Sequence, residues 1–229
     1  MKVLLVLLVL LLGGVVVADR VGVRIAEDKV AQRIVERAGL AGPPAVDITG
    51  FPFLTQAVSG RYTDVRVSLT ADQLGQPAGT QAQVSLRGVR LPLSDVLSGS
   101  VQEVPVDRVD GTATLSYDLL AEQLGGDTTL APAGGGLRIT RTVSVLGFDV
   151  PVTAAGTVSL DGQDVVIDVQ QASAADLDVP GFVLDRAADL LDFRYPVPAL
   201  PFGLQLTSVD PGRDGVQVRA HAAGTVLRG

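Results

Sequence analysis

Cysteine is absent from this 229-residue chain. Its absence excludes disulfide bonds, cysteine-ligated zinc, iron–sulfur clusters, thiol nucleophiles and a lipid-modified N-terminal cysteine. The single histidine, His221, excludes a histidine-rich metal site, and it falls in the polar phase of an expected strand with Gln217 and Arg219. This phase favours a solvated histidine over the base of a Ser–His–acid triad. We therefore expect no metal, no cofactor and no catalytic residues, and hence a protein that is not an enzyme.

Aromatic residues and lysines are also scarce. Tryptophan is absent and aromatic residues make up 4% of the chain, so stacking platforms for sugars or single-stranded nucleic acids are not expected. The only lysines are Lys2 and Lys29, there is no run of Lys and Arg, and the formal net charge is −7. Because this charge repels a phosphate backbone, we expect no nucleic acid partner.

A long apolar run is the first feature that is present. Lys2 precedes an uninterrupted apolar stretch from Val3 to Ala18, and Asp19 and Arg20 end it. This order is typical of a secretory signal. At ~1.5 Å per helical residue the run spans roughly 24 Å, short of the ~30 Å hydrocarbon core, which favours a cleaved signal over a membrane-spanning helix. An uncleaved anchor stays open, because a tilted or flanked helix of this length can persist in a membrane.

We therefore expect residues 1–18 to be a signal peptide or an uncleaved membrane anchor. Residues 19–229 are expected to form a single domain, because about 210 residues are enough for one substantial core. The expected location is the cell envelope or periplasmic space, on the outer side of the cytoplasmic membrane.

Hydrophobic periodicity predicts the elements of this domain. Apolar residues recur at three- and four-residue steps from Asp19 to Ala38, which predicts an amphipathic helix ended by Gly39. Further on, apolar and polar residues alternate, which predicts strands with one buried face. These strands are expected at residues 61–69, 82–91, 137–145, 150–160, 165–169, 203–209 and 215–227, with a short helix at 116–124 and an amphipathic helix at 178–191. A phase change predicts a β-bulge at Gly88, and residues 161–162 predict a hairpin turn.

This order of elements predicts an α+β fold built on antiparallel strands. A sheet that alternates in this way has one wet face, and the two amphipathic helices are the available covers for the other. Small residues stand at inward positions that Val or Leu fill elsewhere, and these are Ala154, Gly156, Ala220 and Ala222. They leave room for a close-packed helix, which is the simpler use of the space, or for a ligand.

Arg141 is a polar residue in an unexpected place. It falls in the apolar phase of its strand, together with Ile139 and Val143. Burying an unpaired guanidinium costs several kcal/mol, so Arg141 must meet an acidic side chain, reach solvent at a rim, or bind an anionic ligand. The third arrangement suits a phosphate headgroup, because a guanidinium binds phosphate in a bidentate manner.

Two pairs of carboxylates lie beside glycines, Asp161 with Asp164 and Asp210 with Asp214. Neither pair has the ligand count of a calcium loop, so we expect both to form turns. An envelope hydrolase that uses paired carboxylates is disfavoured, since no pair lies outside a turn.

Two adjacent motifs resemble the opening signature of the LmeA-like phospholipid-binding envelope proteins of Actinobacteria. They are GFPFLTQ at residues 50–56 and GRYTDV at residues 60–65. The order of signal segment, amphipathic helix, signature and strands is similar to that family as well, and so is VPALPFGL at residues 197–204 before the last strand pair.

The resemblance implies a long curved antiparallel β-sheet wrapped around an amphipathic helix, as in tubular lipid-binding proteins. It implies a phospholipid ligand, a supporting role in the assembly of envelope glycolipid of the lipomannan type, and no catalytic residues. The expected partners are phospholipid, a membrane surface and an envelope glycosyltransferase. The candidate lipid-binding residues are Phe51, Phe53, Leu54, Arg141, Ala154, Phe182, Leu190 and Ala220.

Two alternatives stay open beside this interpretation. Phe51, Phe53 and Leu54 can instead form a hydrophobic plug under the first strand. The protein can also be a non-catalytic structural or adaptor protein of the cell envelope that has no lipid ligand.

A reporter fusion tests export. A reporter fused to the complete chain should cross the membrane, whereas a fusion lacking residues 1–18 should stay cytoplasmic, because the apolar run supplies the export signal. Outward transport of the shortened fusion would overturn this interpretation. N-terminal sequencing of the mature protein decides between cleavage and anchoring.

Overall fold

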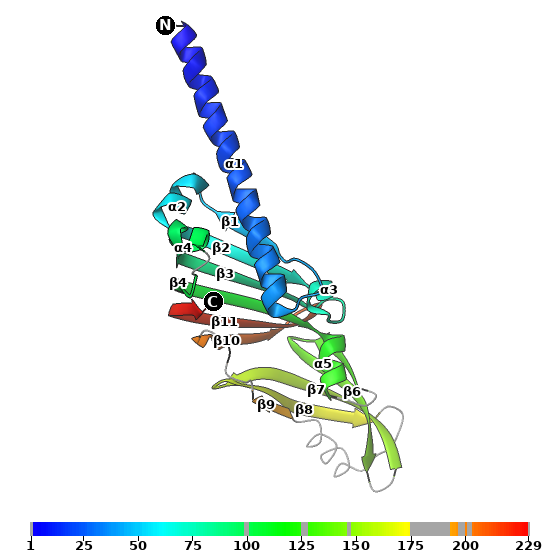
Figure 1. The fold of residues 1–229 in the computed structure, drawn as a ribbon. Coiled ribbons are helices and arrows are strands. Elements are labelled where there is room, and N and C mark those ends of the chain that lie inside the picture. The colour runs from blue at the N-terminus through cyan, green and yellow to red at the C-terminus, as the bar shows by residue number, and fades with distance from the viewer. Residues whose placement is uncertain are drawn as a thin grey trace. The chain divides into compact units, whose positions relative to one another are not determined.

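The computed structural model describes residues 2–98, 101–124, 128–145, 148–174, 193–196, 200 and 203–228. Helices and antiparallel strands both occur in these ranges (Figure 1), which confirms the α+β class. The predicted helix at residues 178–191, which carries the candidate residues Phe182 and Leu190, lies outside the described residues.

The longest element is α1 (Lys2–Ala38), a continuous helix of 37 residues. The sequence predicts an apolar segment followed by a separate amphipathic helix, whereas the structure joins them without a break at Ala18 and Asp19. The Gly39 N–H donates to the Val35 carbonyl at 2.9 Å. Gly39 has a positive φ of 64°, and the helix ends before it, as predicted. Within the described ranges, α1 is the helix long and apolar enough to cross a membrane, and its first half projects beyond the neighbouring strands (Figure 1).

The strands form two antiparallel sheets, a division that the sequence does not predict. The first sheet has the order β1-β2-β3-β4-β11-β10, with β1 (Ala45–Thr49), β2 (Arg61–Thr70), β3 (Gln81–Arg90), β4 (Glu103–Ser116), β10 (Gln205–Pro211) and β11 (Gly215–Arg228). The second sheet has the order β5-β6-β7-β8-β9, with β5 (Thr129–Ala133), β6 (Gly136–Val145), β7 (Phe148–Asp161), β8 (Asp164–Ala174) and β9 (Phe193–Pro196). The short helices are α2 (Phe53–Ser59), α3 (Ala71–Leu74), α4 (Leu93–Ser98) and α5 (Tyr117–Leu124).

The chain clusters into two compact units. Unit 1 comprises residues 1–69, 83–110 and 222–229, and unit 2 comprises residues 70–82 and 111–221. The borders between the units fall inside β2, β3, β4 and β11, so each of these strands gives residues to both, β2 only its last residue to unit 2.

In unit 1, α1 packs against the edge strand β1. Val23 is buried on the face of α1 that the periodicity predicts to be apolar, and Ala31, which the periodicity does not place there, is buried as well. The periodicity places Glu27 with the polar residues, yet Glu27 is half-buried and its Oε1 accepts the Ile48 N–H at 2.9 Å. Because an edge strand has N–H groups that no neighbouring strand accepts, Glu27 supplies an acceptor that the sheet lacks at this position.

The strands of unit 1 follow the predicted alternation in part, since Asp64, expected in the polar phase of β2, is buried. Val65 and Val67 of β2 are buried, and Arg66 between them is exposed. Gly88 of β3 has a positive φ of 65°, as a glycine bulge requires, and Val89 after it is only 6% exposed. The change of phase at Gly88 therefore returns the strand to its buried face, as predicted.

The core of unit 2 joins residues from both sheets. Its buried members are Tyr117, Leu130, Leu137, Ile139, Val152, Ala154, Ile167, Val209 and Val216. The Tyr117 hydroxyl donates to the Gly212 carbonyl at 2.7 Å, and burial, followed by the charge of Asp214, raises the pKa of Tyr117. Ser116 begins α5 as predicted, because its hydroxyl accepts the Leu119 N–H at 3.2 Å.

Gly60 connects the end of α2 to the loop that enters α4. Its carbonyl accepts the Leu91 N–H at 2.8 Å, and its φ is +64°. A Cβ at this position would lie 2.8 Å from the Pro92 Cα, which is closer than real Cβ contacts allow. Gly75 ends α3 with nearly the same φ of +63°, but a Cβ there would meet nothing within 4 Å.

These two glycines form a matched pair for a stability test. Gly75→Ala should lower the free energy of unfolding by about 1–2 kcal/mol, the cost of a left-handed alanine. Gly60→Ala should lower it further, because the backbone of Pro92 must also move. Chemical denaturation of the detergent-solubilised full chain measures both changes. Equal losses for the two variants would contradict the close approach at Gly60.

Candidate functional site

The polar residues of the GFPFLTQ motif hold the connection between β1 and β2. The Gln56 side chain donates to the Thr49 carbonyl at 3.3 Å and accepts the Thr63 N–H at 2.9 Å. The Thr55 hydroxyl donates to the Pro52 carbonyl at 2.7 Å. These bonds fix α2 between the two strands, so the polar half of the motif is structural.

Asp19 of α1 caps the first turn of α2. The N-cap residue Pro52 makes no side-chain cap, and the Leu54 N–H donates instead to Asp19 Oδ1 at 2.8 Å. A carboxylate at this position also interacts favourably with the positive end of the helix dipole. Asp19 is 1% exposed, and within the described residues its Oδ2 has no hydrogen-bond partner. This bond joins the end of the apolar run of α1 to α2.

The structure separates the three apolar residues of the motif into two groups. Phe53 is buried, and its ring lies 6.3 Å from that of Tyr62, whose pKa is raised by burial. Phe51 is 60% exposed and Leu54 is 40% exposed. The plug interpretation therefore describes Phe53, whereas Phe51 and Leu54 remain accessible.

A shallow polar hollow of about 210 Å³ lies on unit 1, and it is lined by Arg61, Gly88, Val89, Arg90 and Asp107. Arg90 forms an ion pair with Asp107. The hollow is smaller than the ~300–1,000 Å³ of pockets that enclose a drug-sized ligand, so its dimensions suit a single charged group rather than acyl chains.

In unit 2, Arg141 and Ala154 share one face of β6 and β7. Arg141 pairs with Val152, and Ile139, two residues before Arg141 in β6, pairs with Ala154. Val152 is fully buried, Ile139 is 2% exposed, and Arg141 is half-buried. The predicted phase of Arg141 is thus confirmed. Within the described part of the chain, Arg141 forms no ion pair with an acidic side chain.

The two alanine candidates have different surroundings. Ala154 is 1% exposed and belongs to the packed core of unit 2. Ala220 of β11 is half-buried, pairs with Leu206 and lies outside that core cluster. The structure therefore brings Ala154 and Arg141 onto one face and does not join Ala220 to them.

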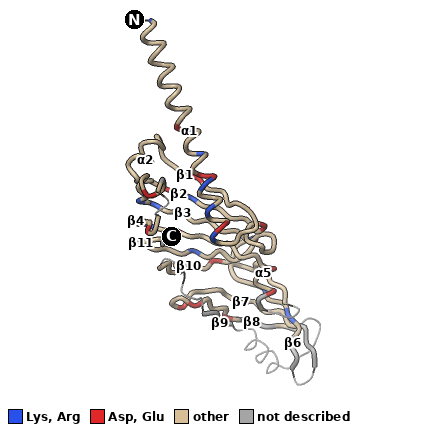
Figure 2. The backbone as a smooth tube through the Cα atoms, in the orientation of Figure 1, with Lys and Arg blue, Asp and Glu red and all other residues tan. Residues whose placement is uncertain are grey.

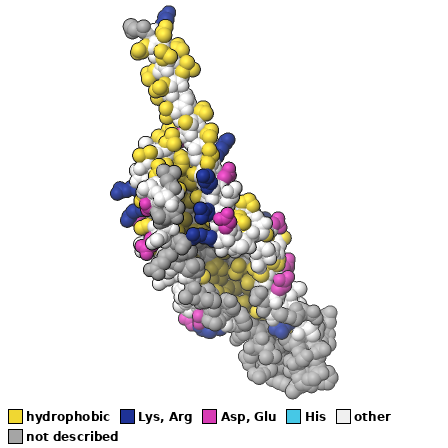
Figure 3. All heavy atoms as spheres, in the orientation of Figure 1, with side chains coloured by type: hydrophobic (Ala, Val, Ile, Leu, Met, Phe, Trp, Pro, Cys, Tyr) yellow, Lys and Arg dark blue, Asp and Glu magenta, His cyan; other side chains and the backbone are white. Residues whose placement is uncertain are grey.

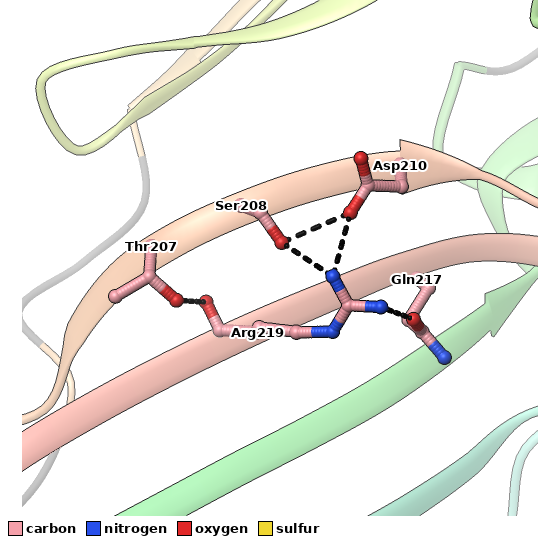
Figure 4. Close-up of polar contacts among 5 residues, drawn as sticks. All are labelled: Thr207, Ser208, Asp210, Gln217 and Arg219. Carbon is pink, nitrogen blue, oxygen red and sulfur yellow. Dashed lines mark hydrogen bonds and ion pairs between the residues drawn. The ribbon is translucent and has the colours of Figure 1, made fainter.

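The polar face of β10 and β11 is organised around Arg219 (Figure 4). Its guanidinium donates to Asp210 at 3.1 Å, to Ser208 at 3.2 Å and to the Gln217 side chain. His221 is half-buried and lies in the same strand phase as Gln217 and Arg219. The predicted polar phase of this strand is confirmed.

The carboxylate pair Asp161 and Asp164 contacts an arginine at its turn. Asp161 pairs with Asp164 across the predicted hairpin, and Arg194 of β9 contacts the two at 2.7 and 3.1 Å. These hydrogen bonds, with that to Asp161 first, raise the pKa of Arg194. No group of three or more possible metal ligands occurs within the ranges that the structure describes.

Sequence reasoning missed several residues of unit 1. Asp19 and Glu27 act through contacts with residues 35 and 21 positions away, which no local pattern reveals. Val58, Leu93 and Val96 were not singled out either, although they are exposed apolar residues on α2 and α4. Apolar residues within short helical segments that also carry polar residues are the signal that would have found them.

The packing of Ala154 generates a stability prediction with an internal control. Ala154→Leu should lower the free energy of unfolding by about 1–3 kcal/mol, because the extra atoms overfill a closed core. Ala155→Leu, on the exposed face of the same strand, should change it by less than about 0.5 kcal/mol. Chemical denaturation of the full chain in detergent compares them. An unchanged stability of Ala154→Leu would show open space beside Ala154.

Comparison with protein families assigns most of the chain. Residues 17–221 match the family model described as LmeA-like phospholipid-binding. No curated protein and no solved structure matches the chain significantly.

Proposed function

Because the chain belongs to the LmeA-like phospholipid-binding family, we propose that it is an exported envelope protein that binds phospholipid in an apolar groove. The family is described by binding and not by catalysis. In this proposal residues 19–229 act as a single lipid-binding domain, and the protein is not an enzyme.

The position of Arg141 is the observation that supports a particular lipid-binding site in this chain. It stands on the apolar face of β6 opposite a fully buried valine, and no acidic side chain in the described ranges neutralises it. A half-buried cation without a counter-ion attracts an anion, and a phosphate offers the geometry that a guanidinium binds best. The phosphate of the lipid would therefore lie at Arg141.

The acyl chains would lie against apolar side chains. In unit 2, Ala220 is a half-buried candidate, whereas the candidate Ala154 is enclosed in the packed core, and the candidates Phe182 and Leu190 lie outside the described residues. Phe51, Phe53 and Leu54 are the candidates of unit 1, taken by itself.

The N-terminal segment supports the proposed location. α1 would direct the chain across the cytoplasmic membrane, either as a cleaved signal or as an anchor, so that the domain works at the membrane surface on the outer side. A lipid-binding protein at this place would support envelope glycolipid assembly, with an envelope glycosyltransferase as its partner.

Replacing Arg141 tests the phosphate contact. Arg141→Gln should weaken binding of an anionic lipid, phosphatidylglycerol, roughly tenfold, since a hydrogen bond to a charged group contributes ~1.5–3 kcal/mol. Binding of phosphatidylcholine should change less. Arg138→Gln is the matched control, because Arg138 is exposed on the opposite face of the same strand. Native mass spectrometry of the purified full chain with each lipid measures the bound fraction.

Three outcomes bear on the proposal. Equal effects of Arg141→Gln and Arg138→Gln would remove Arg141 from the site. Failure of the unmodified chain to bind either lipid would contradict the proposed function and support the adaptor alternative. Lipid that co-purifies with the chain, identified by extraction and mass spectrometry, would support the function independently of Arg141.

A further inference from the structure

Large apolar side chains are exposed on the short helices of unit 1. Phe51, just before α2, is 60% exposed, and Val58 of α2 is 79% exposed. On α4, Val96 is 46% exposed and Leu93 is 37% exposed. With Leu54, at 40%, these five residues form a surface that we call the apolar tip. Neighbouring apolar groups left in water on two helices indicate a surface that binds something apolar.

The two helices of the apolar tip are held together. α2 and α4 contact each other, and the Leu91 N–H donates to the Gly60 carbonyl at 2.8 Å where α2 ends and α4 is about to begin. Gly60 also lies close to the backbone of Pro92, so no side chain separates the end of α2 from the residue that precedes α4. The apolar tip is therefore a defined part of unit 1.

The apolar tip lies level with the end of the apolar run of α1. Asp19, the first charged residue after that run, binds the Leu54 N–H, and the Arg20 guanidinium lies 5.1 Å from the centre of the Phe51 ring. Between Lys2 and Asp19 the helix carries no charged residue (Figure 2). Figure 3 shows hydrophobic side chains along the projecting half of α1 and on the surface that α2 contributes. If α1 enters a bilayer up to Asp19, the apolar tip meets the same bilayer surface.

The charges beside the apolar tip suit lipid headgroups. Arg61 directly follows Gly60 and lines the polar hollow together with Arg90. The acidic residue in the hollow, Asp107, is paired with Arg90, so Arg61 adds an unneutralised positive charge among the described residues that line it. On α4, Asp95 is half-buried and accepts a bond from the Ser94 hydroxyl. Arginines next to exposed apolar residues are the composition of surfaces that lie at a membrane interface.

We propose that the apolar tip inserts into the outer leaflet of the phospholipid bilayer that α1 enters, with Arg20 and Arg61 at the level of the lipid phosphates. The occupant is the bilayer surface, because the apolar tip continues the apolar surface of α1 and begins at its first charged residues. This contact holds unit 1 against the membrane whether or not a lipid occupies the proposed site at Arg141.

The absence of cysteine allows a direct test with single fluorescent labels. Val58→Cys and Val96→Cys place a label on α2 and on α4 of the apolar tip, and Val9→Cys places one in the apolar run of α1. Ala45→Cys is the control, since Ala45 is exposed at the end of β1 remote from α2. Each full-length chain carries an environment-sensitive dye and is reconstituted into phosphatidylcholine and phosphatidylglycerol vesicles with or without a nitroxide-labelled lipid.

The expected result is a blue-shifted emission and strong nitroxide quenching at positions 9, 58 and 96, with quenching at position 45 several times weaker. All four side chains are exposed, so labelling should leave the fold intact. Quenching at position 9 without quenching at 58 and 96 would overturn the proposal and leave the apolar tip to a protein partner. Because the readout is contact with the bilayer and not a bound lipid, its outcome is independent of the Arg141 experiment.

Discussion

The outer edge of β1 is the constraint on which the arrangement of unit 1 depends. An edge strand presents N–H and carbonyl groups that must find partners in water or in the protein, and an open edge invites pairing with other chains. Here α1 lies along this edge, and the Glu27 carboxylate accepts the Ile48 N–H. About two turns nearer the N-terminus, the Asp19 carboxylate accepts the Leu54 N–H. Two acids on one helix thus hold the strand β1 and the helix α2 after it, and they set where the apolar run of α1 ends relative to β1.

The same arrangement explains why the GFPFLTQ motif combines polar and apolar residues. Gln56 and Thr55 satisfy backbone groups of the connection, and Phe53 fills the space against Tyr62. These contacts leave Phe51 and Leu54 outside. Three residues of this motif therefore hold the connection in place, and its two exposed apolar residues are the ones accessible to a ligand. Exposure, and not hydrophobicity alone, therefore separates candidate contact residues from core residues.

Sequence periodicity predicted those parts of the fold in which burial follows a regular repeat. The face of α1 with Val23, the strand β2 and the hairpin at Asp161 are confirmed, because each depends on neighbours in the chain. In β4, by contrast, Val106 and Val109 are the buried apolar residues, and a spacing of three does not indicate a strand. β4 was missed for this reason.

Long-range contacts limited the prediction of the candidate site. The phase of Arg141 could be read from β6 alone and is confirmed. Whether Ala154 lines open space could not be predicted, because its surroundings come from other strands, and the structure places it in a packed core. The capping of α2 by Asp19 joins residues 35 positions apart, and local sequence contains no sign of it.

The course of β2, β3, β4 and β11 through both units affects how the protein can change during evolution. Units joined by a linker can be exchanged, duplicated or lost as modules, since a cut in a linker breaks no strand pairing. Here every border lies within a strand of the six-stranded sheet, so such a cut would leave half-strands with unpaired backbone groups. Variation should therefore enter through the turns and short helices, and the two units should be inherited together.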